Sequence, residues 1–349
     1  MIYNGKKVFE DTPSAADSYR QNYVDGIEKY IARKNKESEH IRDVFMSKIS
    51  LIENIEIYRK EFCDMIGLSA LDRENQPAVE HNFIGSDDVS DIYRLSVHIT
   101  PEIPMYALLF LPKSDKPLPL VIAQHGGNGT PELCSDLIGK NNYKNMVRRL
   151  LERGAAVIAP QLLLWSTEEG ESWRAHKIPF DRSRTDARLK RFGASITALE
   201  ISGIMRCIDY ASSLDEIDEN KIAMIGMSYG GYFTLHTMAS DTRIKAGYVG
   251  CAFNDRNVYD WCDWCYNGSA EKFHDAEIAA LCAPRRLYIS VGKQDSVFDY
   301  RHSLNEGERA KKYYEILGVP DNIRFSIWDG GHTPEDSDVG YDFIFETLI

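Results

Sequence analysis

The chain has 349 residues, of which 43% are hydrophobic and 27% charged, with a formal net charge of −12 at pH 7. These values are typical of a globular protein and exclude a disordered or fibrous chain. The acidic balance repels polyanions and no dense basic stretch offsets it, which argues against a nucleic-acid partner.

No apolar run reaches the length of a membrane span, and the first residues lack the apolar core of a secretory signal. We therefore expect a cytoplasmic protein with no membrane partner. The seven cysteines form no framework pattern, which suits reduced thiols. Cys262 and Cys265 form a lone C-x-x-C motif, and we expect packing rather than a metal or redox role. Neither a metal nor a cofactor is predicted.

Two amphipathic patterns occupy the N-terminal region. Apolar residues recur at helical spacing from Tyr19 to Ile31 and again from Ile52 to Ile66, and Gly67 is placed as a C-cap. We expect residues 1–75 to be helices packed on the following domain, either as a cap or as the interface of a homo-oligomer. Residues 76–349 would then form the catalytic domain.

The remaining pattern predicts the α/β class. Alternating apolar residues from Tyr93 to Ile99, a proline-flanked turn and a return from Met105 to Leu111 predict an antiparallel hairpin at the sheet edge. From Leu120 onward, strand-like and helix-like segments alternate. This order predicts a mostly parallel central sheet with helices on both faces.

The most specific motif lies between residues 221 and 238. Ile222 to Ile225 form a strand-like run that leads into Gly226-Met227-Ser228-Tyr229-Gly230, and Tyr232 to Met238 follow with helical spacing. Gly-x-Ser-x-Gly between a strand and a helix is the pattern of a nucleophile elbow. We therefore predict that Ser228 is a catalytic nucleophile.

A serine nucleophile needs a base and an acid, and both are found downstream in the expected order. Arg286 to Gly292 predict a buried strand, and Asp295 follows it on a loop. Ile323 to Trp328 predict the next strand, followed by His332. Asp295 is the predicted acid and His332 the predicted base, with Asp299 as the alternative acid.

The apolar segment from Pro119 to Gln124 predicts a further strand that ends in His125-Gly126-Gly127. Glycine amides can approach a developing negative charge closely. We predict an oxyanion hole formed by the backbone amides of Gly127 and Tyr229. His125 is expected to anchor this loop rather than transfer protons.

These motifs resemble those of α/β-hydrolases of the dienelactone hydrolase and acetyl xylan esterase type, over about residues 80–349. The resemblance implies an α/β-hydrolase fold with a triad of Ser228, Asp295 and His332. The segment Ser-Tyr-Gly-Gly-Tyr at 228–232 is also similar to the elbow of the prolyl oligopeptidase family.

Two predicted insertions, at 161–192 and 252–284, are expected to shape the substrate site, because such loops surround the nucleophile. Aromatic faces stack on sugar rings. The candidate substrate-binding residues are Trp165, Trp173, Trp261 and Trp264. The arginines of the first insertion could bind a substrate carboxylate, or they could form a solvated helix face paired with Asp181 and Asp186.

The predicted function is a serine carboxylesterase that hydrolyses small acyl esters through an acyl-enzyme, with an acetylated sugar as one candidate substrate. A serine peptidase is the first alternative, although helical N-terminal residues cannot form the blades of a propeller. A non-catalytic binding protein is the second alternative. The complete set of nucleophile, acid, base and oxyanion loop argues against it.

Overall fold

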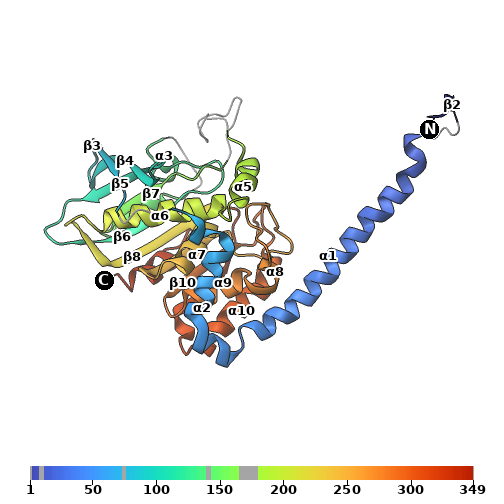
Figure 1. Cartoon of the computed structure of the whole chain (residues 1–349). Helices are drawn as coiled ribbons and strands as arrows, with labels where there is room; N and C mark the ends of the chain where they lie inside the picture. Colours follow the sequence, from blue (N-terminus) through green and yellow to red (C-terminus); the bar gives the residue numbers. More distant parts are fainter. Residues whose placement is uncertain (1, 8–11, 73–75, 139–142, 165–179, 349) are drawn as a thin grey trace.

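The computed structural model describes residues 2–7, 12–72, 76–138, 143–164 and 180–348. Within these residues a nine-stranded sheet has the order β11-β10-β9-β8-β6-β7-β5-β4-β3 (Figure 1). Its strands are β3 (Val79–Ser86), β4 (Ser90–Thr100), β5 (Ile103–Pro112), β6 (Leu118–Gln124), β7 (Ala156–Pro160), β8 (Ile217–Met227), β9 (Ile244–Gly250), β10 (Arg286–Gly292) and β11 (Ile323–Trp328). A separate two-stranded ribbon joins β1 (Ile2–Tyr3) and β2 (Lys6–Lys7).

The helices of the described residues follow the alternation expected for an α/β protein. They are α1 (Asp17–Phe45), α2 (Lys48–Ile66), α3 (Pro131–Cys134), α4 (Met146–Leu151), α5 (Arg182–Lys190), α6 (Ile196–Ala211), α7 (Tyr229–Ser240), α8 (Ser269–Lys272), α9 (Asp275–Cys282), α10 (Leu304–Ile316) and α11 (Val339–Phe345). Short 3-10 turns lie at Pro13–Ala16, Leu68–Ala70, Tyr300–Ser303 and Pro320–Asn322. No helix among them is long and apolar enough to span a membrane.

The sheet is parallel from β7 through β6, β8, β9 and β10 to β11, and antiparallel among β3, β4, β5 and β7. The predicted hairpin is therefore present as β4 and β5. It does not form the edge of the sheet, however, because β3 pairs with β4 outside it. Most residues of β3 are exposed, so its sequence does not alternate between apolar and polar residues and the strand was not predicted.

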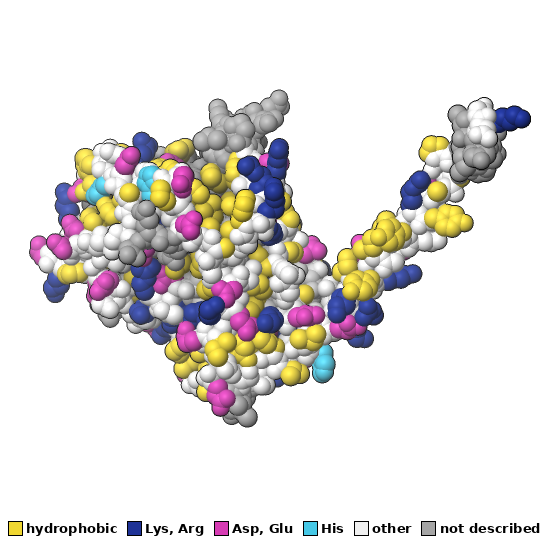
Figure 2. Space-filling model, in the orientation of Figure 1, with side chains coloured by type: hydrophobic (Ala, Val, Ile, Leu, Met, Phe, Trp, Pro, Cys, Tyr) yellow, Lys and Arg dark blue, Asp and Glu magenta, His cyan; other side chains and the backbone are white. Residues whose placement is uncertain are grey.

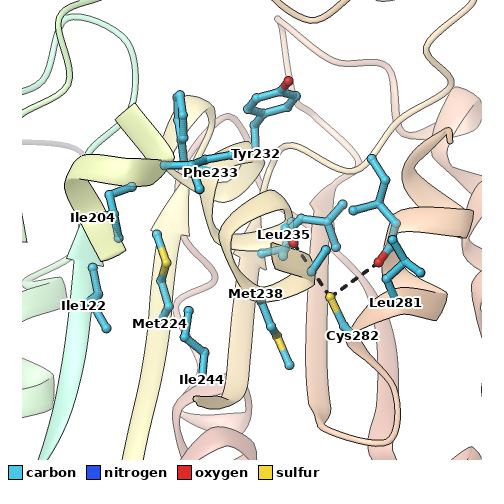
Figure 3. Close-up of a cluster of buried hydrophobic side chains, with 14 of the residues drawn as sticks. Ile122, Ile204, Met224, Tyr232, Phe233, Leu235, Met238, Ile244, Leu281 and Cys282 are labelled. Atoms are coloured by element: carbon cyan, nitrogen blue, oxygen red, sulfur yellow. Dashed lines mark hydrogen bonds between the residues drawn. The ribbon is translucent and has the colours of Figure 1, made fainter. Parts of the chain in front are cut away.

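Helices cover both faces of the sheet because successive residues of each buried strand point to opposite sides. Leu120 and Ile122 pack into the core with α2, α6, α7, α9 and α10, whereas Val121 and Ala123 pack against α3, α4 and α11. Figure 3 shows the first of these cores, where side chains of β6, β8 and α7 meet. This packing holds α7 rigidly against the sheet, and α7 follows the predicted nucleophile.

The N-terminal helices differ in how they contact the catalytic domain. Helix α2 packs with Phe62 and Ile66 buried, and it ends at Gly67 in a left-handed conformation (φ 88°) as a C-cap requires. Among the described residues, helix α1 contacts the domain through its C-terminal part, where buried Arg42 binds Glu277 and Glu306. Its N-terminal part projects away from the domain (Figure 1).

His236 of α7 is a buried histidine whose environment predicts sensitivity to acid. Its ring centroid lies 3.7 Å from that of Tyr232 with the planes tilted by 30°, and its Nδ1 lies 2.8 Å from the Tyr232 carbonyl oxygen. Burial, assisted by the positive charge of Arg256, lowers the pKa of His236 to about 3. Below pH 6.5 the unfolded chain therefore binds a proton that the folded chain rejects, and folding stability falls as the pH decreases.

We expect one such histidine to reduce the free energy of unfolding by about 1.4 kcal/mol per pH unit between pH 6 and 4. In His236→Gln the free energy of unfolding should therefore depend less steeply on pH than in the native chain, by the equivalent of one bound proton. Urea unfolding monitored by circular dichroism at several pH values measures this slope. Leu235→Met, a volume-conserving change in the same buried helix that alters no ionisable group, is the matched control and should keep the native slope. An unchanged slope in His236→Gln would contradict this account.

Candidate active site

The C-terminal ends of the parallel strands lie next to one another, along the edge of the sheet that runs across the strands. Met227 pairs with Gly250 at the end of β9, and Gly250 pairs with Ser290 of β10. Gly292, at the end of β10, pairs with Trp328 at the end of β11. The register therefore brings the residues that follow β8, β10 and β11 to the same edge, where ligands bind in open α/β sheets.

Ser228 lies between β8 and α7 with a positive φ, at φ 58° and ψ −124°. Such a conformation is strained for a residue with a side chain, and it is the geometry of a nucleophile elbow. The Ser228 amide donates to the carbonyl of Gly250 (2.8 Å), and its carbonyl accepts from the amide of Tyr232 (3.0 Å). The turn is thus held by both β9 and α7.

Only glycine fits on either side of the serine. A Cβ added to Gly226 would lie 2.2 Å from the carbonyl oxygen of Gly230. A Cβ on Gly230 would lie 2.1 Å from the carbonyl oxygen of Gln124 in β6. Both distances are far below van der Waals contact, so the two glycines allow the close approach of the helix to the strands.

The loops after β10 and β11 bring the predicted acid and base together. His332 Nδ1 lies 2.8 Å from Asp295 Oδ2, and the carboxylate is nearly inaccessible while the imidazole is partly exposed. Because a carboxylate only accepts, Nδ1 donates and Nε2 is left available as a base. This is the role that an acid has in a hydrolase triad.

The environment of Asp295 keeps its carboxyl ionised. Burial alone would raise its pKa, but the hydrogen bond from His332 and the amides of Phe298 and Val297 outweigh burial and lower it. Those amides donate to Oδ1 at 2.9 and 2.8 Å. The alternative acid, Asp299, instead caps a 3-10 turn and binds Arg301.

The two loops also bind each other through their backbones. The amide of Gln294 donates to the carbonyl of Gly330 (2.8 Å), and the amide of Lys293 donates to that of Trp328 (2.9 Å). A Cβ on Gly292 would lie 2.4 Å from the Gly330 oxygen, so the chains touch there. This contact fixes the distance between acid and base.

The glycine loop after β6 lies against the elbow. A Cβ on Gly126 would lie 3.0 Å from the Cβ of Ser228. Buried His125 holds this loop: its Nε2 accepts from the amide of Leu162 at 2.9 Å, and its Nδ1 lies 2.9 Å from the Gly126 carbonyl. These contacts fit the anchoring role predicted for His125. Gly127, the predicted oxyanion donor, is the residue directly after Gly126 in this loop. That the amides of Gly127 and Tyr229 form an oxyanion hole stays a prediction.

The side chain of Tyr229 forms part of an aromatic wall that reaches the base. Its ring stacks on Trp261 with centroids 5.5 Å apart, Trp261 lies 5.8 Å from Phe298, and Phe298 lies 5.5 Å from His332. Tyr229 and Trp261 also line a hollow of about 530 Å³ together with Leu164, Arg182 and Asp263. The hollow begins at the residue that follows Ser228.

The four candidate tryptophans have different environments. Trp165 and Trp173 lie outside the described residues. Trp264 is 4% exposed, stacks on Tyr232 at 4.5 Å and is covered by Arg256, so it packs in the core and presents no face to a ligand. Trp261 is 38% exposed, so of the two described candidates it is the one whose ring can contact a substrate.

Arg182 neither faces solvent on the helix surface nor is free to bind a substrate carboxylate, which were the two expectations for the arginines of the first insertion. It is buried, with Nε 2.7 Å from Asp263, Nη2 2.7 Å from Glu200 and Nη1 2.8 Å from the carbonyl of Leu163. It therefore links the two predicted insertions instead of facing solvent. Burial would lower its pKa, but the two carboxylates raise it, so the arginine stays charged.

Cys251 lies beside the acid and the base, although the sequence did not single it out. Its thiol donates to the carbonyl of Thr333 at 3.2 Å, next to His332, and its backbone is left-handed (φ 50°). Burial raises the pKa of this thiol, so it is neutral. Nothing in the spacing of the sequence indicated this contact.

The motif cysteines Cys262 and Cys265 are free and exposed, so the expectation that they pack in the interior is wrong. Cys262 Sγ lies 3.2 Å from Ser183 Oγ, and Cys265 Sγ lies 3.2 Å from the carbonyl of Asp260. In the part of the chain that the structure describes, the one converging group of metal-ligand side chains is Cys251, Asp295 and His332, which does not include them.

Comparisons with known proteins bear on the fold of the chain. The model of the prolyl oligopeptidase family matches residues 198–281, which include the elbow. The quorum-quenching protein AidA of Acinetobacter baumannii is 26% identical over 149 residues, 43% of this chain, and the match spans 40% of that protein.

Two esterase structures are similar over most of the chain. A glucuronoyl esterase from Solibacter usitatus has a TM-score of 0.62 at 16% identity, with 83% of this chain and 92% of that chain covered. Acetyl xylan esterase 1 from Thermoanaerobacterium has a TM-score of 0.55 at 15% identity, with 85% and 94% covered. The chain therefore has the α/β-hydrolase fold. Within that class, its fold is of the type found in acetyl xylan and glucuronoyl esterases.

Proposed function

We propose that this protein is a serine carboxylesterase that hydrolyses short-chain acyl esters through an acyl-enzyme. The observation that carries the proposal is the 2.8 Å contact between His332 and Asp295 at the strand edge where Ser228 occupies a strained elbow. The similarity to esterase structures supports it at the level of the fold.

In the proposed reaction, His332 Nε2 takes the proton of the Ser228 hydroxyl as its oxygen attacks the ester carbonyl. Amides of Gly127 and Tyr229 stabilise the oxyanion, and the alcohol leaves with the proton from His332. Water then attacks the acyl-enzyme by the same route and releases the acid. Asp295 holds the imidazole in the required tautomer throughout.

The hollow beside Tyr229 favours a compact, uncharged substrate. Among the described residues that line it, the buried cation is Arg182, which is already paired with Asp263 and Glu200 and so offers no net positive charge to a substrate carboxylate. The exposed part of Trp261 offers an aromatic surface on which a sugar ring can stack. We therefore propose a small acyl ester, with an acetylated sugar as the candidate alcohol.

A hydrolysis screen across nitrophenyl esters, acetylated sugars and aminoacyl amides tests this function. We expect acetyl esters to be cleaved faster than octanoyl esters, and esters faster than matched amides. Trp261→Ala should raise KM for an acetylated sugar about fivefold more than for ethyl acetate, because stacking contributes about 1 kcal/mol only when the alcohol carries a ring that can lie on the indole. Equal effects on both substrates would mean that Trp261 does not contact the sugar.

Phe83→Ala is the matched control for this screen. Phe83 is an exposed aromatic residue on β3, which is the edge strand farthest from β10 and β11 in the strand order. Its removal should leave both KM values unchanged. A parallel rise in this variant would show that the effect of Trp261→Ala is not local.

A serine peptidase is the second candidate, because the prolyl oligopeptidase family model matches the segment that contains Ser228. Against it, residues 17–45 and 48–66 are helices, and a propeller blade needs four strands. Rapid cleavage of a prolyl amide in the same screen would favour the peptidase. Cleavage of no ester or amide would favour the binding protein.

A further inference from the structure

Helix α1 carries a continuous apolar surface that nothing in the described chain covers. Every residue from 17 to 33 is exposed, and Figure 2 shows hydrophobic side chains along the projecting helix. We define the α1 stripe as Tyr19, Tyr23, Val24, Ile27, Tyr30 and Ile31, which are 43–75% exposed. Their spacing of three and four residues places them on one face.

The stripe continues into a face that is already buried. At the same helical spacing, Ile27 and Ile31 are followed by Ser38 and Arg42, which are buried against the catalytic domain. The helix therefore uses one face throughout, and its N-terminal half lacks the partner that its C-terminal half has. Helical stability in proteins comes mostly from packing of such a face.

The area of the stripe is close to what a stable interface requires. Three tyrosines that are more than half exposed contribute roughly 400 Å², and the three aliphatic residues add roughly 200 Å². Two copies in contact would bury about 1,200 Å², the lower bound for a specific protein interface. A single small ligand would leave most of the stripe exposed.

The charges around the stripe favour another protein surface over a lipid surface. Between residues 17 and 33, α1 carries three acidic and three basic side chains, namely Asp17, Asp25, Glu28, Arg20, Lys29 and Arg33. A membrane-surface helix needs an excess of basic residues, whereas this segment is neutral in a chain of net charge −12.

The position of Gly26 points to a symmetric pair. A Cβ on Gly26 would meet nothing within 4 Å, so packing within the chain does not require glycine there. Glycine weakens a helix interior, yet it allows two helices to approach closely. Gly26 lies next to the midpoint of the stripe and at its tyrosine edge, three residues after Tyr23 and four before Tyr30, so in an antiparallel pair the two copies of Gly26 lie side by side near the crossing point.

The direction of pairing follows from the location of the catalytic domain. The domain covers the stripe face beyond Ser38, so a parallel partner helix would carry its own domain into the same space. An antiparallel partner places the two domains at opposite ends. We propose that two copies of this chain pair through the α1 stripe in an antiparallel arrangement, about a two-fold axis near Gly26.

Analytical ultracentrifugation of the full chain tests this pairing. We expect a species of twice the 39.8 kDa chain mass at micromolar concentration. Tyr23→Asp combined with Ile27→Asp should raise the dimer dissociation constant at least 100-fold, because it buries charge in an apolar interface. The matched control, Gln21→Asp with Ala32→Asp, adds the same charge on the opposite helix face and should stay dimeric.

Disulfide cross-linking gives a second readout that does not depend on disrupting the helix. Under mild oxidation, Gly26→Cys should yield a covalent dimer in excess of the native chain, because the two copies of residue 26 meet at the axis. In Lys36→Cys the two thiols would be roughly 30 Å apart at 1.5 Å per residue, so no excess is expected.

Three results would overturn the proposal. The native chain could sediment as a monomer at 100 μM, or the stripe variant could remain as dimeric as its control. The monomer could instead bind vesicles of phosphatidylcholine and phosphatidylserine through the stripe, which would assign the surface to lipid. Circular dichroism of each variant confirms that the fold is retained.

Discussion

Ser228→Ala is expected to abolish ester hydrolysis, with kcat reduced by roughly 10⁴- to 10⁶-fold. The reason is that the proposed reaction forms its covalent bond at the Ser228 oxygen, and alanine offers no nucleophile to the ester carbonyl. A fluorophosphonate probe should label the native chain at Ser228 and should not label the variant. Kinetics on nitrophenyl acetate and mass spectrometry of the labelled peptide measure the two effects.

Two variants control this experiment. Ser213→Ala removes an exposed serine that binds only the carbonyl of Tyr210 among the described contacts, and it should keep full labelling and activity. Ser228→Cys keeps a nucleophile at the elbow and should form an acyl-enzyme. Labelling that persists in Ser228→Ala would place the nucleophile at another residue.

Two strands of the site could be predicted from the sequence with their bounds, whereas β8, expected at Ile222 to Ile225, is longer and runs from Ile217 to Met227. Arg286–Gly292 and Ile323–Trp328 have the predicted bounds. The first is buried along almost its whole length, and the second, at the edge of the sheet, mixes apolar with polar residues, but both end where polar loop residues begin. The elbow could be predicted because its geometry leaves no room for a Cβ at Gly226 or Gly230, so the glycines that mark the motif are required by the structure. Once the strand ends were placed, chain order alone positioned Asp295 and His332 at one edge.

Side-chain networks between distant segments could not be predicted. Arg182, Glu200 and Asp263 form one buried cluster, yet they lie in separate segments of the chain with no shared motif. The sequence also could not show which aromatic residue faces a substrate. Trp261 and Trp264 lie three residues apart, and only the three-dimensional packing shows that the first ring is exposed and the second is buried. The periodicity of residues 19–31 likewise showed an apolar face without showing what covers it.

Asp295→Asn is expected to reduce kcat by about 10⁴-fold while it leaves the fold intact. Asparagine fills the same volume, but its amide can donate toward Nδ1 of His332 and so stabilise the wrong imidazole tautomer. Because hydrogen bonds keep the pKa of Asp295 low, its ionisation should not limit activity between pH 5 and 8. Asp299→Asn, the control at the alternative acid, should retain activity because that carboxylate binds Arg301.

The triad proposal also predicts how these losses combine. His332→Ala should cost about as much activity as Ser228→Ala, and the double variant should be no worse than either single variant, because the residues act as one unit. Independent contributions would instead multiply, so the double variant would lose the product of the two factors. Single-turnover kinetics with nitrophenyl acetate separates these cases. A multiplicative loss would mean that His332 acts on the substrate by a route that does not pass through Ser228.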